Sequence, residues 1–225
     1  MDAIDFKLLE LLQHNAEMTV QQLSADGADV VKVFASASIR DGGNRVMSDP
    51  QIKAACEEAT AQGLRTTVHA YGTEVIRSVI LAGCTSVEHG NHYDEEVIEL
   101  LADYGTYITP QLALLYQNYF DNRERFLGIG NYTAAGFARM EEARERGIDT
   151  FIQTIENPAV NVVFGSDAVA GAHGQNVEEL VARVEALGGG EAHVVGVQRI
   201  WHHQMRGVRN RAPKGQIIAV IIGII

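Results

Sequence analysis

From residue 28 onward, short apolar runs alternate with longer amphipathic stretches. The apolar runs are rich in β-branched side chains and predict strands at residues 29–36, 65–70, 85–89, 106–114 and 161–168. The amphipathic stretches repeat apolar residues with helical spacing and predict helices at residues 49–62, 73–82, 94–104, 134–146, 150–156 and 176–187. The polar and aromatic segment 116–132 is interpreted as an extended loop.

Punctuating residues support these boundaries. Ser48 followed by Pro50 is typical of a helix start, and Gly63, Gly83 and Gly105 stand where three of the helices should end. Strand–helix units that repeat every 20 to 30 residues predict a parallel sheet with helices packed outside it. The strands are apolar throughout, which is typical of strands buried on both faces. A doubly wound sheet and a (β/α)8 barrel both fit this periodicity.

Composition and charge exclude several classes of function. The chain has 225 residues, of which 46% are hydrophobic and 21% charged, as in an ordinary soluble globular protein. A formal charge of −11 argues against a nucleic-acid partner, because phosphate binding needs a basic face. No signal peptide is apparent, and the apolar run 217–225 is too short to cross a membrane. We therefore expect a cytoplasmic protein.

The two cysteines, Cys56 and Cys84, lie in unrelated surroundings and form no CxxC pair. This excludes zinc-finger and thioredoxin-type sites. In a reducing compartment we expect two buried free thiols.

Ionisable residues occupy chemically suggestive positions on four of the predicted strands. Lys32 lies inside an apolar strand, while His69, His89 and Asp167 stand at strand ends. In a βα barrel the carboxyl ends of the strands converge on one mouth, where catalysis occurs. Taken singly, each histidine could be a packing residue and Asp167 could cap a turn. Lys32 in a buried strand needs a partner, a lowered pKa or a covalent modification.

Four segments in order, GADVVKVFAS, TVHAYG, VEHG and FGSDAVAGAHGQN, resemble motifs of the metal-dependent amidohydrolase superfamily. The resemblance covers residues 27–187 and is strongest to the imidazolonepropionase-like and Xaa-Pro dipeptidase-like (prolidase-like) branch. It implies an α/β fold: a partial (β/α)8 barrel comprising about the last five βα units, preceded by a helical segment. The implied activity is hydrolysis of C–N bonds in amides, peptides or cyclic amides of small-molecule substrates.

The resemblance also implies a binuclear divalent metal centre, usually of zinc. Lys32 would be carbamylated and bridge the two metals, His69 and His89 would bind the second metal, and Asp167 would bind the first and act as general base. Such donors suit zinc. Tyr71 could hold a substrate carbonyl or carboxylate, or simply stack at the rim. His173 could contact substrate or orient a ligand, or be a plain loop residue.

The chain departs from the family pattern in one essential respect. The first metal of the family needs a His-x-His pair, and none occurs in the sequence. The β-sandwich and the first three βα units that should precede Lys32 are missing too. We therefore expect one bound metal or none, and an inactive, truncated or fused reading frame is an alternative to an active hydrolase.

The two ends of the chain suggest further segments. A helical segment is expected at residues 1–26, with a first amphipathic helix and with Thr19 placed to cap a second one. Its first 24 residues resemble the opening of the winged helix-turn-helix of leucine-responsive regulators, and two generic amphipathic helices that cover the open edge of the sheet are the alternative. A DNA-binding regulator is thus a third alternative, although the recognition helix is missing. The expected domains are this helical segment, a partial barrel at residues 27–188 and an irregular tail at 189–225. Unpaired sheet edges in an incomplete barrel favour a homo-oligomer.

Overall fold

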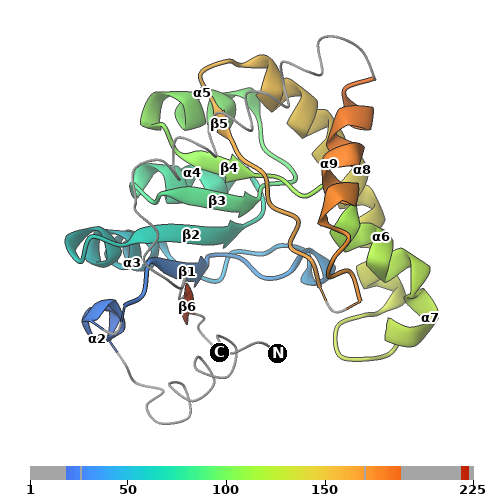
Figure 1. Cartoon of the computed structure of the whole chain (residues 1–225), viewed down its shortest axis with the longest axis horizontal. Coiled ribbons are helices and arrows are strands. Elements are labelled where there is room, and N and C mark those ends of the chain that lie inside the picture. The colour runs from blue at the N-terminus through green and yellow to red at the C-terminus, as the bar shows by residue number, and fades with distance from the viewer. Residues whose placement is uncertain (1–18, 26, 170, 189–218, 223–225) are drawn as a thin grey trace.

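The computed structural model describes residues 19–25, 27–169, 171–188 and 219–222. Within them the strands form one six-stranded parallel sheet in the order β5-β4-β3-β2-β1-β6 (Figure 1). The strands are β1 Val30–Phe34, β2 Arg65–Ala70, β3 Ser86–His89, β4 Tyr107–Thr109, β5 Asn161–Val162 and β6 Ala219–Ile222.

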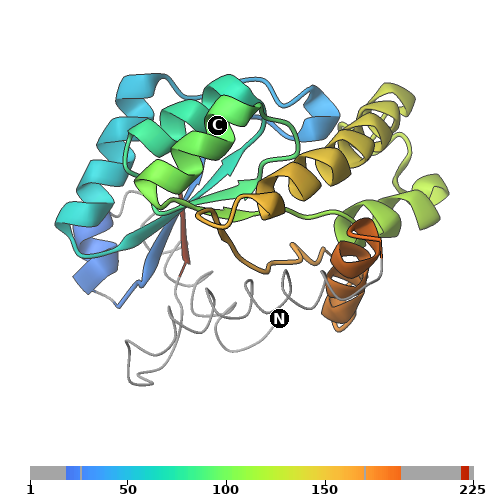
Figure 2. The same ribbon diagram turned by 90° about the horizontal axis from the view of Figure 1, so that it is seen from above.

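Strand order decides between the two architectures that the periodicity left open. From β1 to β5, each strand lies beside the next one in the chain, whereas a doubly wound sheet reverses its strand order at a switch point. Helices α3 Asp49–Ala61, α4 Thr73–Leu81 and α5 Glu95–Tyr104 form a layer on one face of the sheet (Figure 2). This is the arrangement of a barrel segment, and it confirms the predicted fold class.

The main core lies between the sheet and this helical layer. Val31, Val33, Val68, Val87 and Ile108 have no exposed surface and belong to the same apolar cluster. Burying side chains of this size is the largest favourable contribution to such a fold, roughly 1.5–3 kcal/mol for each.

The opposite face of the sheet is only half-buried, which corrects the expectation of strands buried on both faces. Lys32, Thr67, Ser86 and Glu88 alternate with the core valines along β1, β2 and β3. Glu88 Oε1 accepts hydrogen bonds from Thr67 Oγ1 at 2.5 Å and Ser86 Oγ at 3.1 Å. This face therefore carries a polar network instead of a second apolar core.

The predicted helix boundaries are confirmed for α3, α4 and α5. Ser48 and Gln51 form a capping box at the start of α3. The Asp94 side chain accepts a hydrogen bond from the Val97 amide at 3.1 Å and caps α5, and Gly105 ends α5 in a left-handed conformation with φ 65°.

The predicted loop 116–132 is wrong. It contains most of α6 Leu114–Asp121 and all of α7 Arg123–Phe126, and the strand predicted at 106–114 ends at Thr109. Tyr116 and Tyr119 are spaced to face the same side of α6, and they pack in a second apolar cluster with Phe137. Tyr116 and Tyr119, two of the aromatic residues of the predicted loop, thus lie on the buried face of α6.

Helices 134–146 and 150–156 are in fact one helix, α8 Ala134–Glu156. Gly147 lies inside this helix. A larger residue would not fit there, because a Cβ would be 2.9 Å from Asn91 Nδ2. The predicted break between the two helices is therefore wrong, and it falls at a point of close packing. Beyond α8, the predicted strand 161–168 keeps its strand pairing only in β5, and α9 Asn176–Ala186 follows as predicted.

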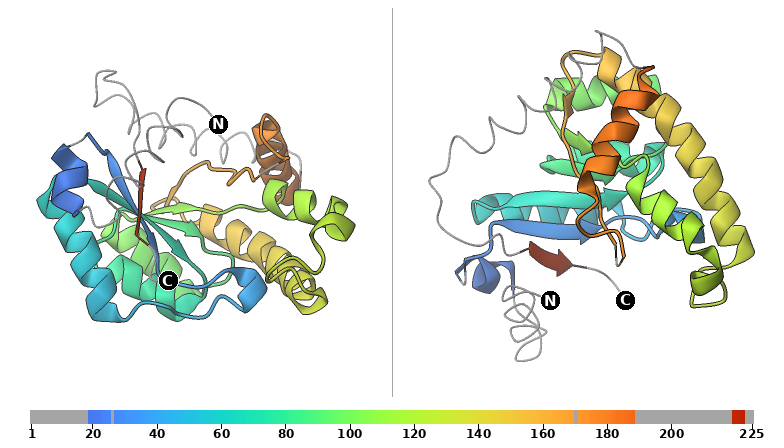
Figure 3. Two further views of the ribbon diagram at one scale, coloured as in Figure 1. Left: turned by 90° about the horizontal axis from the view of Figure 1, so that it is seen from below. Right: turned by 45° about the vertical axis from the view of Figure 1, so that its right-hand side comes forward.

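Near the ends of the chain, α2 Val20–Ala25 begins as predicted, since Thr19 Oγ1 accepts a hydrogen bond from the Gln22 amide at 3.2 Å. Strand β6 lies beside β1 at one edge of the sheet (Figure 3), in a tail that was expected to be irregular. The predicted first amphipathic helix and its regulator-like resemblance lie outside the described residues. The proposed domain boundaries stay predictions.

Cys56 of α3 and Cys84, which precedes β3, form a disulfide, so the prediction of free thiols is wrong. Their Cα atoms are 5.2 Å apart, within the range of a disulfide, and the bond links α3 to the turn that follows its neighbour α4. Disulfides are uncommon in reducing compartments, so the cytoplasmic location stays a prediction. In the described part of the chain, no helix has the length and apolarity to cross a bilayer.

Candidate metal centre

A cavity of about 240 Å³ opens at the carboxyl ends of β1, β2 and β3. Five of the six predicted site residues line it: Lys32, His69, Tyr71, His89 and Asp167. They come from four separate strands and loops, so the parallel sheet is what brings them together.

The two histidines are in direct contact. The ring centroids of His69 and His89 are 4.4 Å apart, with an interplanar angle of 74°. Burial, followed by the charge of His89, lowers the pKa of His69 to about 3, and burial, followed by the charge of Lys32, lowers that of His89 to about 3. Both rings are therefore neutral near pH 7 and can offer a nitrogen lone pair. His89 Nδ1 is buried, and the polar side chain that faces this histidine is Gln111, whose hydrogen bond opposes the lowering of the His89 pKa.

Lys32 projects from β1 into the same cavity, with Nζ 5.5 Å from the centroid of the Phe34 ring. Burial lowers the pKa of the Lys32 amine, against the opposing charges of Glu88 and Asp167. A lowered pKa increases the fraction of neutral amine, which is the nucleophilic form.

Backbone strain coincides with two of these residues. His89, with φ 74°, and Asp167, with φ 45°, are the non-glycine residues of positive φ in the described ranges. This conformation is costly for residues with a Cβ and is concentrated at functional sites. His89 is the last residue of β3 and Asp167 lies in the segment after β5, so both strained residues lie at the mouth of the sheet.

Tyr71 forms one wall of the cavity. Its amide donates to Ser36 Oγ at 3.0 Å, and its ring stacks on His89 with centroids 5.0 Å apart and an interplanar angle of 13°. Burial raises the pKa of the Tyr71 phenol well above its usual range, so the hydroxyl stays protonated and can donate a hydrogen bond.

His173 does not join this group. It is exposed in the turn that follows Asp167 and does not line the cavity. Asp167 itself is exposed, in keeping with its position at the rim.

Sequence reasoning missed the far wall of the cavity. Arg40, Leu115, Tyr116, Tyr119 and Met140 line it, from the turn after β1 and from α6 and α8. The helical spacing of Leu115, Tyr116 and Tyr119 was a usable signal for α6. No local pattern marks Arg40.

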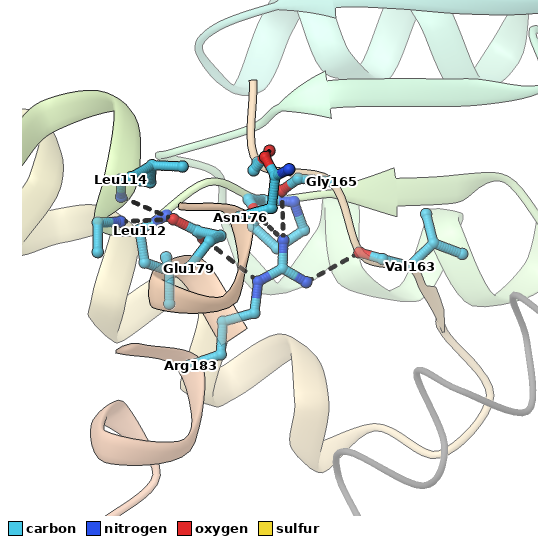
Figure 4. A network of polar contacts seen from close by, with 10 residues as sticks. Leu112, Leu114, Val163, Gly165, Asn176, Glu179 and Arg183 are labelled. Atoms are coloured by element: carbon cyan, nitrogen blue, oxygen red, sulfur yellow. Dashed lines mark hydrogen bonds and ion pairs between the residues drawn. The ribbon is translucent and has the colours of Figure 1, made fainter. Parts of the chain in front are cut away.

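Sequence reasoning also missed a buried ion pair on α9 (Figure 4). Glu179 and Arg183 have no exposed surface, and Arg183 Nε lies 3.3 Å from Glu179 Oε1. The Glu179 carboxylate accepts hydrogen bonds from the amides of Leu112, Ala113 and Leu114 at 2.7–3.0 Å. These amides lead into α6, so the carboxylate holds the start of the helix that forms the far wall.

Arg183 holds the other side of the same junction (Figure 4). Its guanidinium donates to the carbonyls of Val163 at 2.9 Å and Gly165 at 3.1 Å, and also to that of Pro110. Gly165 lies two residues before Asp167. The ion pair thus joins the Asp167 segment to the end of β4 and to α6.

The donor set fits part of a metal centre. Two neutral imidazoles in contact suit a divalent ion such as zinc, and an amine and a carboxylate share their cavity. The described ranges contain no group of three His, Cys, Asp or Glu side chains placed to bind one ion. Together with the missing His-x-His pair, this does not fit a complete binuclear centre.

The family model of the amidohydrolase family matches residues 5–193. The chain belongs to the amidohydrolase family. Membership implies a divalent metal, which agrees with the partial donor set, and it confirms the resemblance seen in the four motifs.

Known relatives match parts of this amidohydrolase. An uncharacterised protein of Mycobacterium tuberculosis is 32% identical over 121 residues, which cover 48% of this chain and 30% of that protein. The ochratoxinase of Aspergillus niger is 39% identical over 83 residues, covering 35% of this chain and 17% of the enzyme. The match therefore spans about a third or less of the length of these curated relatives.

Solved structures agree in fold. A Xaa-Pro dipeptidase with bound methionine is 28% identical, with a TM-score of 0.66, and the match covers 84% of this chain and 45% of that one. A prolidase complexed with N-methylphosphonate-L-proline is 25% identical, with a TM-score of 0.65, over 83% and 43% of the two chains. These similarities confirm the prolidase-like branch and the barrel-type architecture.

Proposed function

We propose that Lys32, His69, His89 and Asp167 form this chain's part of a zinc-type metal centre that hydrolyses C–N bonds of small amides. The proposal is carried by one observation: an amine, two neutral imidazoles and a carboxylate from separate segments line the same cavity. The dipeptidase and prolidase relatives favour a substrate of dipeptide size, and a cyclic amide is the alternative.

When bound, a divalent ion would lower the pKa of a coordinated water and polarise the scissile carbonyl. His69 and His89 would hold the ion through neutral ring nitrogens. The neutral Lys32 amine would add to carbon dioxide, forming an N–C bond and releasing a proton, and the resulting carbamate would supply carboxylate oxygens. Asp167 would accept a proton from the attacking water and deliver it to the leaving nitrogen. The Tyr71 hydroxyl would donate to the substrate carbonyl oxygen.

A second candidate function is metal binding without turnover. It is favoured by the missing His-x-His pair and by the absence of a three-ligand group in the described ranges. On this view the chain keeps half of the family's centre and lacks the ligands that position the attacking water.

One experiment separates the two candidates. Zinc per chain is measured by elemental analysis on the full chain, and hydrolysis of an Xaa-Pro dipeptide and of N-acetyl-L-phenylalanine is followed in parallel. We expect zinc to bind at up to one ion per chain, measurably above zero, with slow turnover that a chelator abolishes. Zinc without any turnover leaves only the second candidate. A chain that binds no zinc, or a His89→Asn variant that binds as much as the parent, contradicts both.

A further inference from the structure

Arg40 lies in the single 3-10 turn Ile39–Asp41 that follows β1, and its half-buried side chain lines the cavity that also holds Lys32 and His69. Its guanidinium carbon is 4.3 Å from the centroid of the Tyr132 ring and 5.3 Å from that of Tyr119. Two aromatic faces therefore support a cation at the far wall of the candidate centre.

Polar contacts fix Arg40 at both ends. Its Nε donates to Asn131 Oδ1 at 3.2 Å, and Asn131 Nδ2 in turn donates to Asp41 Oδ2 at 2.6 Å. The Arg40 carbonyl accepts a hydrogen bond from Arg139 Nη1 at 2.8 Å. The side chain is therefore held in place before any ligand binds, which reduces the entropy lost on binding.

The terminal nitrogens of Arg40 remain available. In the described part of the chain, they have no hydrogen-bond acceptor, and no carboxylate lies within ion-pair distance of them. A half-buried guanidinium with open donors is a binding site for a planar anion, because two parallel N–H groups match the two oxygens of a carboxylate.

Charge and shape in the cavity narrow the ligand further. The other basic side chain of the lining, Lys32, belongs to the proposed metal centre, so the guanidinium of Arg40, which stays charged at any ordinary pH, is the cation left to face a substrate anion. Phe34, Leu115 and Met140 add apolar surface to the lining, whereas its carboxylate, Asp167, is exposed at the rim and belongs to the proposed metal centre. A ligand with a carboxylate next to an apolar or aromatic side chain complements both features.

We propose that Arg40 is a specificity-determining residue that binds the free carboxylate of the substrate and selects acids over neutral amides. The inference rests on the proposed function for the location of the scissile bond, but carboxylate binding itself needs neither metal nor turnover. Leu115 and Met140 would contact the side chain beside that carboxylate.

The test compares two probes that differ only in charge, N-acetyl-L-phenylalanine and N-acetyl-L-phenylalaninamide. Binding of each to the full chain in the presence of a chelator is measured by ligand-observed NMR titration. We expect the parent chain to bind the acid about 10- to 100-fold more tightly than the amide, the range for hydrogen bonds to a charged group. Arg40→Met should bring this ratio close to one, and Arg40→Lys should give an intermediate ratio.

Arg125→Met is the matched control, because Arg125 also lies over an aromatic ring, Phe126 at 6.0 Å, but is exposed and does not line the cavity. It should leave the ratio unchanged. Equal binding of acid and amide by the parent chain overturns the inference, even if Arg40→Met fails to fold. If the preference for the acid depends on Arg40 but the chain hydrolyses neither substrate, the proposed activity is refuted and this inference stands.

Discussion

At the scale of single residues, the candidate centre consists of polar groups that the fold has removed from water. His69 and His89 are 9% and 5% exposed, and this burial keeps both rings uncharged. A neutral imidazole pair is the state that a metal requires, and it makes the metal-free chain sensitive to acid.

We predict that the metal-free chain loses stability as the pH falls below about 6.5. The folded pKa of about 3 for each histidine lies below the unfolded value of about 6.5, so between these values the unfolded state binds more protons. Each histidine should lower the free energy of unfolding by about 2 kcal/mol between pH 8 and pH 5. Urea unfolding in a chelator measures this, and His89→Asn should show a clearly shallower dependence. A flat profile from pH 8 to pH 5 contradicts the prediction.

Lys32→Met should separate metal binding from folding. Removing a partly desolvated amine from β1 should raise the free energy of unfolding of the metal-free chain by about 1 kcal/mol at neutral pH. The same change should abolish most zinc binding, because it removes the proposed carbamate. Denaturant titration and elemental analysis of the same sample test both effects. A less stable variant would mean that Glu88 and Asp167 stabilise the ammonium more than burial penalises it.

The sequence pointed to Lys32, His69, His89 and Asp167 because each polar residue interrupts or ends an apolar strand. Arg40 could not be found in this way. It lies in a short polar turn where an arginine is unremarkable, and its importance depends on Tyr119 and Tyr132, about 80 and 90 residues further along the chain.

At the scale of secondary-structure elements, α9 connects the cavity wall to the Asp167 segment. One face of this helix carries the ion pair of Glu179 and Arg183, whose partners are backbone groups at the ends of β4 and β5. A buried pair of this kind fixes geometry, and losing one member leaves the other without compensation.

We therefore predict that Arg183→Met destabilises the fold by about 3–5 kcal/mol, because Glu179 would keep a buried charge without its cation. Arg146→Met is the control, since Arg146 forms the same i,i+4 pair with Glu142 on the exposed side of α8 and should cost at most about 1 kcal/mol. Thermal unfolding followed by circular dichroism compares the two. Equal losses would show that the α9 pair contributes no more than a surface pair.

Helices whose ends are marked by capping residues in the sequence were predicted well. Helices that are stabilised mainly by packing against residues far away in the sequence were not. Ser48, Pro50 and Gly105 mark helix ends through contacts within a few residues, so α3 and α5 were found. Segment 116–132 was missed because its helices are stabilised by packing against Phe137 of α8. The break predicted between residues 146 and 150 was wrong for the same reason, because Gly147 lies inside α8 where it packs against the distant Asn91.

At the scale of the whole molecule, the described sheet is a barrel segment with two outer strands, β5 and β6. Its inner face carries a polar network, and only the face under α3, α4 and α5 is fully buried. In a closed barrel neither the edges nor this inner face would be open.

We predict that the purified chain associates with itself, because outer strands present unpaired backbone groups that other strands can pair with. Size-exclusion chromatography with light scattering should give a mass above that of one chain, and dilution should lower it. A stable monomer at all concentrations would contradict this prediction. It would indicate that the edges are covered within the chain itself.

The sequence by itself determined the repeating strand–helix order, most helix boundaries and the residue types of the centre, because these depend on local periodicity and capping. The tertiary structure decided the rest. It placed β1 to β5 in sequential order, brought Arg40 to the cavity of His69 and His89, and joined Cys56 to Cys84. Such relations depend on how distant segments pack. The free energy of that packing comes from contacts between segments, so no single stretch of sequence determines it.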